Sequence, residues 1–175
     1  IVFDRIAEGT LALTDQFIVS EKAWKMGGSR SFLQAGRSYS LDELLHGVIV
    51  QSGNDAAVVI AEGISGTEDN FAAEMNMTAA KLGMKNTRFT NSTGWPDPEL
   101  TTTAHDLALL STAIIKNFPA DKFPELYPIF KKKTYTLNGI KQGNRNPLLY
   151  GKSSQSKGVD GLKTGYTSES VSYTH

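Results

Sequence analysis

Apolar residues recur at helical spacing through most of the first 120 positions. The clearest stripe has apolar residues three and four apart, at Leu41, Leu44, Leu45, Val48 and Ile49. Ser40 precedes this stripe and Glu43 stands three residues later, which is the capping-box pattern that begins a helix. We therefore predict a helix that begins at residue 41 and ends near residues 51–53.

Four other segments combine an apolar stripe with a polar residue at its start. Ser20 begins a brief turn that runs to Trp24. Asn54 and Asp55 are expected to cap a very apolar segment, residues 56–61, which Gly63 should end. The fully apolar character of residues 56–61 predicts a helix that is buried on all sides.

Two longer helices are predicted further along the chain. One begins at Thr67 and stops at Gly83, and the other begins at Thr103 and ends before Pro119. Residues 1–9 are also helical in pattern, and they resemble the end of a helix without its beginning. The chain is therefore expected to be a fragment whose first helix begins before Ile1.

Beyond residue 127 the pattern changes from helices to strands. Residues 133–137 and 140–142 flank Asn138-Gly139, which is a strong signal for a type I′ hairpin. Residues 151–158 are a polar loop, and residues 159–165 are expected to enter a strand. The order predicts an α+β fold in one domain, residues 1–175, with about 1–125 mainly helical and about 127–175 forming strands.

Composition and charge exclude several functional classes. With 18 basic and 18 acidic residues the net charge is 0, so the chain carries no electrostatic footprint for nucleic acid. No apolar run approaches the roughly 18 residues of a membrane span. Cysteine is absent and the three histidines (His46, His105 and His175) are scattered, so neither a metal nor a cofactor is expected.

Two short motifs carry the candidate chemistry. Ser52-Gly53-Asn54 stands in a turn between two predicted helices, and Lys163-Thr164-Gly165 follows 111 positions later on a predicted strand. Each alone has an ordinary explanation, since Ser52-Gly53 can end a helix, Asn54 can cap one and Lys163 can be a solvated strand residue. Together, in this order, they match two of the three motifs of serine β-lactamases and penicillin-binding proteins.

Four strings show that the chain resembles the serine-type D-alanyl-D-alanine carboxypeptidases, which are low-molecular-mass penicillin-binding proteins. They are residues 20–24 (SEKAW), 51–57 (QSGNDAA), 144–149 (NRNPLL) and 159–167 (VDGLKTGYT). The resemblance implies a β-lactamase/DD-peptidase-like fold, in which a helical part packs on a five-stranded antiparallel sheet with the active site between them. It implies D-Ala-D-Ala peptides of peptidoglycan and β-lactam antibiotics as partners, no cofactor, and a role in cell-wall synthesis and cell shape. It also implies an extracytoplasmic location, in the bacterial periplasm or at the outer face of the cytoplasmic membrane.

The resemblance also assigns catalytic roles. Ser52 would relay a proton between the catalytic lysine and the leaving nitrogen, because a hydroxyl both donates and accepts. Asn54 would bond to the amide backbone of the substrate. Lys163 would hold positive charge near the nucleophile.

The resemblance also assigns substrate-binding roles, to the three residues that follow Lys163 and to Arg145. Thr164 would donate to the terminal carboxylate, and Gly165 would let the peptide backbone come close. The backbone N–H of Tyr166 would form half of the oxyanion hole. Arg145 is a weaker candidate for carboxylate recognition.

The chain departs from the family pattern at both ends. The S-x-x-K motif, which carries the attacking serine, would lie about ten residues before Ile1. The one literal match, Ser154 to Lys157, stands in a polar loop and is interpreted as a coincidence. After Thr167 the family continues through at least two more strands. We therefore expect an internal fragment that forms no covalent penicillin adduct by itself.

Alternative functions remain open at this point. A serine β-lactamase is disfavoured because no E-x-x-L-N string occurs. A transpeptidase or endopeptidase of the same fold fits the same motifs. A non-catalytic peptidoglycan-binding relative that has lost its nucleophile fits them as well, and the residues before Ile1 would distinguish it from the enzyme.

Overall fold

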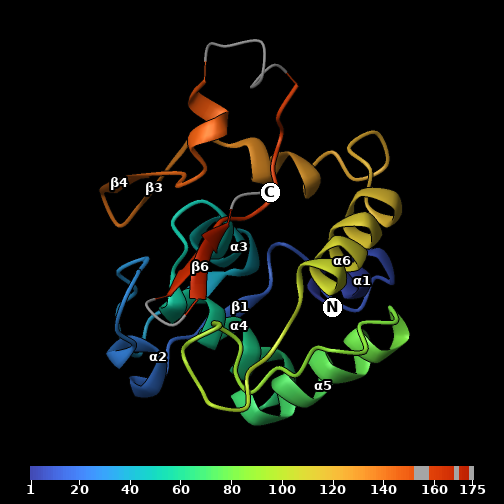
Figure 1. Ribbon diagram of the computed structural model, residues 1–175. Helices are drawn as coiled ribbons and strands as arrows, with labels where there is room; N and C mark the ends of the chain where they lie inside the picture. Colours follow the sequence, from blue (N-terminus) through green and yellow to red (C-terminus); the bar gives the residue numbers. More distant parts are fainter. Residues whose placement is uncertain (152–157, 168–169, 174–175) are drawn as a thin grey trace.

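The computed structural model describes residues 1–151, 158–167 and 170–173. The helices are α1 (Val2–Ala7), α2 (Glu21–Lys25), α3 (Leu41–Ile49), α4 (Asn54–Ser65), α5 (Glu68–Lys81) and α6 (Ala104–Asn117), with short 3₁₀ turns η1 (Tyr127–Lys131) and η2 (Pro147–Tyr150). The strands are β1 (Gln16–Ile18), β2 (Ser38–Ser40), β3 (Thr134–Leu137), β4 (Ile140–Gly143), β5 (Gly165–Thr167) and β6 (Ser170–Tyr173). Figure 1 shows α3 and α4 at the centre, with α5 and α6 to one side and the β3–β4 hairpin at the upper left.

The polar residues that precede α3, α5 and α6 cap these helices, as predicted. At α3, the hydroxyl of Ser40 accepts from the backbone N–H of Glu43, while the Glu43 carboxylate accepts from the backbone N–H of Ser40 at 2.8 Å. At α5 and α6 the cap is one-sided: the side chains of Thr67 and Thr103 accept from the backbone N–H groups of Asn70 and Asp106. Local capping therefore determines where these helices begin.

Helix α4 departs from the prediction at both of its ends. Its N-cap is Gly53, and the side chains of Asn54 and Asp55 bond to a distant loop. The helix passes through Gly63 and ends at Ser65. A Cβ on residue 63 would lie 1.9 Å from the Phe17 ring, so only glycine fits there. Gly63 therefore serves close packing, and Gly66, with φ of +77°, ends the helix.

Within the described ranges the strands form three separate antiparallel pairs, β1–β2, β3–β4 and β5–β6. Asn138 and Gly139 have φ of +50° and +76°, which confirms the predicted hairpin turn. The five-stranded sheet implied by the resemblance is not formed by the described residues. Each described strand pairs with a single neighbour, so none of them lies inside a larger sheet.

The strand predicted to begin before Lys163 begins later, at Gly165. The preceding backbone is not in a strand ladder. In this segment the carbonyl of Gly161 accepts from a side chain instead, Asn146 Nδ2, at 3.3 Å. Lys163 and Thr164 therefore lie immediately before β5 and not on it.

The core holds α3 and α4 against the rest of the molecule. Helix α4 buries almost all of its apolar segment, as predicted, at Ala56, Val58, Val59, Ile60 and Ala61. Because both helices around the turn at residues 50–53 are buried, that turn has a fixed position. Among the described residues no helix combines the length and hydropathy needed to cross a membrane.

Candidate active site

The turn between α3 and α4 presents Ser52 in an unusual backbone conformation. Its φ of +58° lies in the left-handed region, which costs a residue with a Cβ on the order of 1 kcal/mol. The next residue has no room for a side chain, since a Cβ on Gly53 would lie 2.1 Å from the Ser31 hydroxyl. The backbone N–H of Gly53 donates to the carbonyl of Gly47 at 3.0 Å, which closes the turn.

Lys163 reaches this turn from the other end of the sequence. Its Nζ donates to Ser52 Oγ at 2.9 Å and to the Thr164 carbonyl at 2.7 Å. Burial, together with the positive charge of Arg145, lowers the pKa of Lys163 to about 8. The structure thus brings the two motifs together as a hydrogen-bonded pair of side chains.

Asn54 lies beside this pair but its amide is partly engaged. The Asn54 Nδ2 donates to the carbonyl of Gly27 at 2.9 Å, and its backbone N–H donates to the carbonyl of Ser29 at 2.8 Å. An amide has two N–H donors and an acceptor oxygen, so one bond to Gly27 does not exhaust it. The predicted role of Asn54 in substrate binding stays a prediction.

Asp55 was expected only to cap the helix that follows it. It is fully buried, and its carboxylate accepts from the backbone N–H groups of Ser31 at 2.8 Å and Leu33 at 3.2 Å. A carboxylate in the first turn of an otherwise apolar helix was the available signal, because a buried charge needs fixed partners. Asp55 attaches the loop of residues 26–37 to the Ser52 turn.

Arg145 is held near Lys163 by the two asparagines that flank it. Buried Asn144 donates to the carbonyl of Lys132 at 3.1 Å and accepts from the backbone N–H of Asn146 at 2.9 Å. Asn146 in turn bonds to Gly161, two residues before Lys163. The N-R-N string therefore fixes a loop whose central, exposed arginine adds positive charge at Lys163.

The remaining predicted substrate-binding residues follow Lys163 directly. Thr164 is half-buried, and Gly165 begins β5, where it pairs with Tyr173. The Tyr166 side chain is 77% exposed. Their predicted roles stay predictions. The S-x-x-K match from Ser154 to Lys157 lies outside the described residues.

Of the two described histidines, His46 is buried and packed, whereas His105 is exposed. His46 Nε2 lies 3.0 Å from Lys132 Nζ, and its ring stacks on Tyr135 with 4.3 Å between centroids. His105 is paired with Asp106 at the start of α6, and His175 lies outside the described residues. Over the described ranges no three His, Cys, Asp or Glu residues come together as metal ligands.

Comparison with known proteins gives one consistent family. Residues 1–172 match the family model described as Peptidase_S11, D-alanyl-D-alanine carboxypeptidase. The D-alanyl-D-alanine carboxypeptidase DacA of Haemophilus influenzae is 41% identical over 167 residues, which are 94% of this chain and 40% of that protein. DacF of Bacillus subtilis is 36% identical over 170 residues, which are 97% of this chain and 42% of that protein.

Solved structures agree with the sequence comparison. Penicillin binding protein 5 from Haemophilus influenzae superposes with a TM-score of 0.88 at 39% identity, covering 98% of this chain and 48% of that one. Penicillin binding protein 6B from Escherichia coli gives a TM-score of 0.85 at 40% identity, covering 95% and 52%. The mixed helical and antiparallel-strand fold class is thereby confirmed. The chain spans about 40% of the length of the curated relatives it matches.

Proposed function

We propose, because the chain belongs to the family of D-alanyl-D-alanine carboxypeptidases, that its Ser52–Lys163 site serves a serine peptidase acting on peptidoglycan stem peptides. The reaction is removal of the terminal D-alanine. The observation that carries the proposal is the 2.9 Å bond between Lys163 Nζ and Ser52 Oγ, which joins the family's two matched motifs across 111 residues.

Ser52 is suited to pass on a proton. Its oxygen accepts from Lys163, which leaves the hydroxyl hydrogen free to be donated to the leaving nitrogen of a cleaved peptide. Lys163 keeps that hydroxyl oriented. The attack itself belongs to the serine of the family's S-x-x-K motif, so Ser52 and Lys163 are assigned supporting roles.

The charge at the site favours a substrate that ends in a carboxylate. Lys163, with a pKa of about 8, is mostly protonated at neutral pH, and the guanidinium of Arg145 adds a second positive charge. Two cations attract the terminal carboxylate of a peptide and stabilise the oxyanion that forms during acylation. Penicillins carry a carboxylate as well, so we include β-lactams among the ligands.

The substrate also indicates where the protein works. Peptidoglycan stem peptides are mature in the cell wall, so the proposed activity belongs outside the cytoplasm, in the bacterial periplasm or at the outer face of the cytoplasmic membrane. There it would trim the wall and so influence cell shape.

The central test is substitution of Lys163 in the natural full-length protein. Lys163→Ala should slow acylation by a fluorescent penicillin, and release of D-alanine, by about 10²-fold or more. The control is Lys141→Ala, which removes an exposed lysine on β4 and should leave both rates unchanged. Near-normal acylation by a folded Lys163→Ala protein would refute the assignment.

Ser52→Ala separates a proton relay from simple binding. A relay acts mainly in the transition state, so the acylation rate constant should fall more than the affinity of the initial complex. A change confined to KM would count against the relay.

A further inference from the structure

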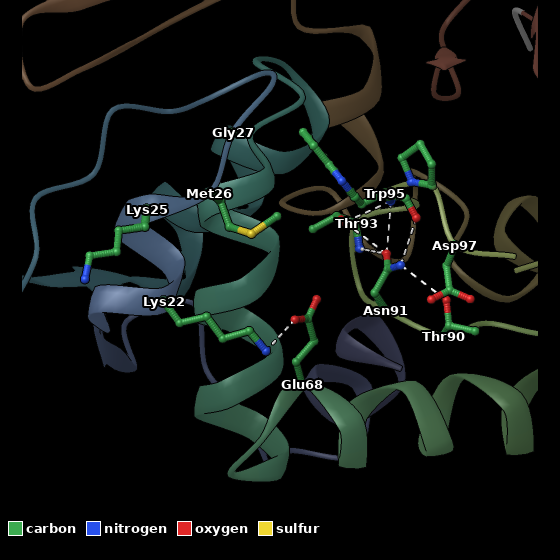
Figure 2. Close-up of a pocket in the computed structure, with 11 residues that line it drawn as sticks. Lys22, Lys25, Met26, Gly27, Glu68, Thr90, Asn91, Thr93, Trp95 and Asp97 are labelled. Atoms are coloured by element: carbon green, nitrogen blue, oxygen red, sulfur yellow. Dashed lines mark hydrogen bonds and ion pairs between the residues drawn. The ribbon is translucent and has the colours of Figure 1, made fainter. Parts of the chain in front are cut away.

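A solvent-open hollow lies between α2 and the loop of residues 90–97, with Gly27 in its wall (Figure 2). Its volume is about 550 Å³, within the roughly 300–1,000 Å³ of small-ligand sites. The largest side chain in its lining is Trp95, whose indole is 45% exposed. None of the chemistry described above uses this hollow.

The backbone of Trp95 is held in a fixed turn although its side chain is exposed. The Asn91 carboxamide oxygen accepts from the backbone N–H groups of Gly94 at 2.8 Å and Trp95 at 3.0 Å. Asn91 Nδ2 donates back to the Trp95 carbonyl at 2.9 Å. Binding of a ligand to this indole therefore costs little conformational entropy in the loop.

The hollow adjoins the Ser52–Asn54 turn through a pair of glycines. A Cβ on Gly27 would lie 3.3 Å from the Trp95 ring, and a Cβ on Gly28 would lie 2.9 Å from both Trp95 Cζ3 and Asn54 Nδ2. The Gly27 carbonyl accepts from Asn54 on its other side. A ligand bound in the hollow would thus be separated from the Ser52–Asn54 turn only by the backbone of Gly27 and Gly28.

The charges around the hollow cancel one another. Lys22 Nζ lies 2.8 Å from Glu68 Oε2, and the backbone N–H and hydroxyl of Ser92 bond to Glu68 Oε1. Burial opposes the charged form, yet the bonds from Lys22 and Ser92 hold the pKa of Glu68 below its usual value. Two lysines and two carboxylates line the hollow in total. It therefore fits a neutral ligand with many hydrogen-bonding groups better than an ion.

We propose that the hollow binds a sugar ring of the glycan strand that carries the stem peptide, namely an N-acetylated amino sugar. The proposal rests on the proposed function for the polymer but not on the catalytic roles. The C–H face of a pyranose stacks on the exposed indole, where apolar contact is strongest. The hydroxyl groups of the sugar meet the side chains of Thr90, Thr93 and Asp97, and Met26 and Pro96 supply apolar surface for an acetyl methyl group.

The test is a titration of the protein with the trisaccharide of N-acetylglucosamine, which contains no peptide. The chain has two tryptophans, and Trp24, on α2 outside the hollow, is also 45% exposed. Trp24→Phe should leave the affinity unchanged and isolate a saturable change in Trp95 fluorescence. Trp95→Ala should weaken binding at least tenfold. The NMR signal of the Trp95 indole N–H in the unaltered protein provides the same readout without a variant.

The outcomes separate this inference from the proposed function. No shift of the Trp95 signal, or equal affinity in Trp95→Ala, overturns the sugar site even if the protein cleaves a sugar-free D-Ala-D-Ala peptide. If the natural full-length protein binds the trisaccharide but fails to cleave that peptide, the proposed function alone is overturned. An equal Trp95 response to a sugar-free stem peptide overturns the sugar assignment, because the hollow is then a peptide subsite.

Discussion

Lys163 is an amine whose surroundings make its charge labile near neutral pH. Burial and the nearby Arg145 both disfavour the ammonium form, so its pKa falls from 10.5 to about 8. The folded protein therefore holds fewer protons than the unfolded chain between about pH 8 and 10.5, and Lys163 makes the free energy of unfolding rise with pH in that window. Below about pH 8 the cost of the buried charge is fully present.

A pH profile of acylation tests this property. If the charged form of Lys163 is needed, the rate of penicillin acylation should decline as pH rises through about 8. Arg145→Gln removes the neighbouring positive charge, so the pKa of Lys163 should rise and the decline should move to higher pH. A decline at the same pH in both proteins would mean that another group titrates there.

At the scale of elements, the loop of residues 26–37 connects the Ser52 turn to the β3–β4 hairpin. Asp55 holds one side of the loop through the backbone N–H groups of Ser31 and Leu33. On the other side, Asn138 Nδ2 donates to the carbonyl of Phe32 at 3.1 Å, and Gln142 Nε2 donates to the carbonyl of Arg30 at 3.1 Å. The loop is thus a spacer with polar attachments on both faces.

Asp55→Asn should release one of these attachments. An amide N–H₂ would face a backbone N–H donor in a buried position, at a cost of about 1–3 kcal/mol of unfolding free energy. Hydrogen exchange at the amides of Ser31 and Leu33 should accelerate beyond that of the helices. Asp69→Asn, at an exposed position on α5, is the control and should change neither quantity. Unaltered exchange at residues 31 and 33 would show that Asp55 does not hold the loop.

The elements that could be predicted are those whose signals are local. Ser40 and Glu43 determine the start of α3 within four residues, and Asn138-Gly139 determines the hairpin turn by its own backbone preference. The packing role of Gly63 could not be read locally, because its contact is with Phe17 far upstream. The bond from Asn146 to Gly161 ahead of β5, and those from the loop to Asp55, likewise join residues 15 and more than 20 positions apart.

The candidate site, too, could be predicted only in part. The residue types at Ser52 and Lys163 pointed to one location because they match a family pattern. Their geometry is determined by long-range packing, including the buried asparagines beside Arg145 and the left-handed turn at Ser52. The hollow beside Trp95 had no sequence signal, since residues 91–98 showed only turn chemistry.

At the scale of the whole molecule, Phe3 connects α1 both to the end of the helical part and to the segment that leads into the later strands. Its ring lies 5.4 Å from that of Phe118, at the end of α6, and 6.0 Å from that of Phe130 in η1. Phe130 also packs on Gly161, where a Cβ would lie 2.9 Å from the Phe130 Cβ. An aromatic cluster of Phe3, Phe118 and Phe130 thus supports the segment that leads to Lys163.

Phe3→Ala should therefore affect the whole molecule at once. Loss of a buried phenylalanine ring should lower the free energy of unfolding by about 3–5 kcal/mol. Unfolding in urea should remain a single transition, with coincident far-ultraviolet and aromatic circular dichroism signals. Two separated transitions would show that the helical part and the later strands are not one cooperative unit.

The 111-residue separation between Ser52 and Lys163 has a consequence for how the protein is made. During synthesis the turn between α3 and α4 leaves the ribosome early, with both of its helices available to fold. Lys163 emerges only after the hairpin and η2, and at roughly 5–20 residues per second the delay is about 6–22 seconds. A nascent chain stalled after α6 but before residue 163 can contain a folded helical body, but Ser52 will lack Lys163 as its partner. The chemical competence of the site is therefore acquired late and in one step, when the segment after Gly161 docks.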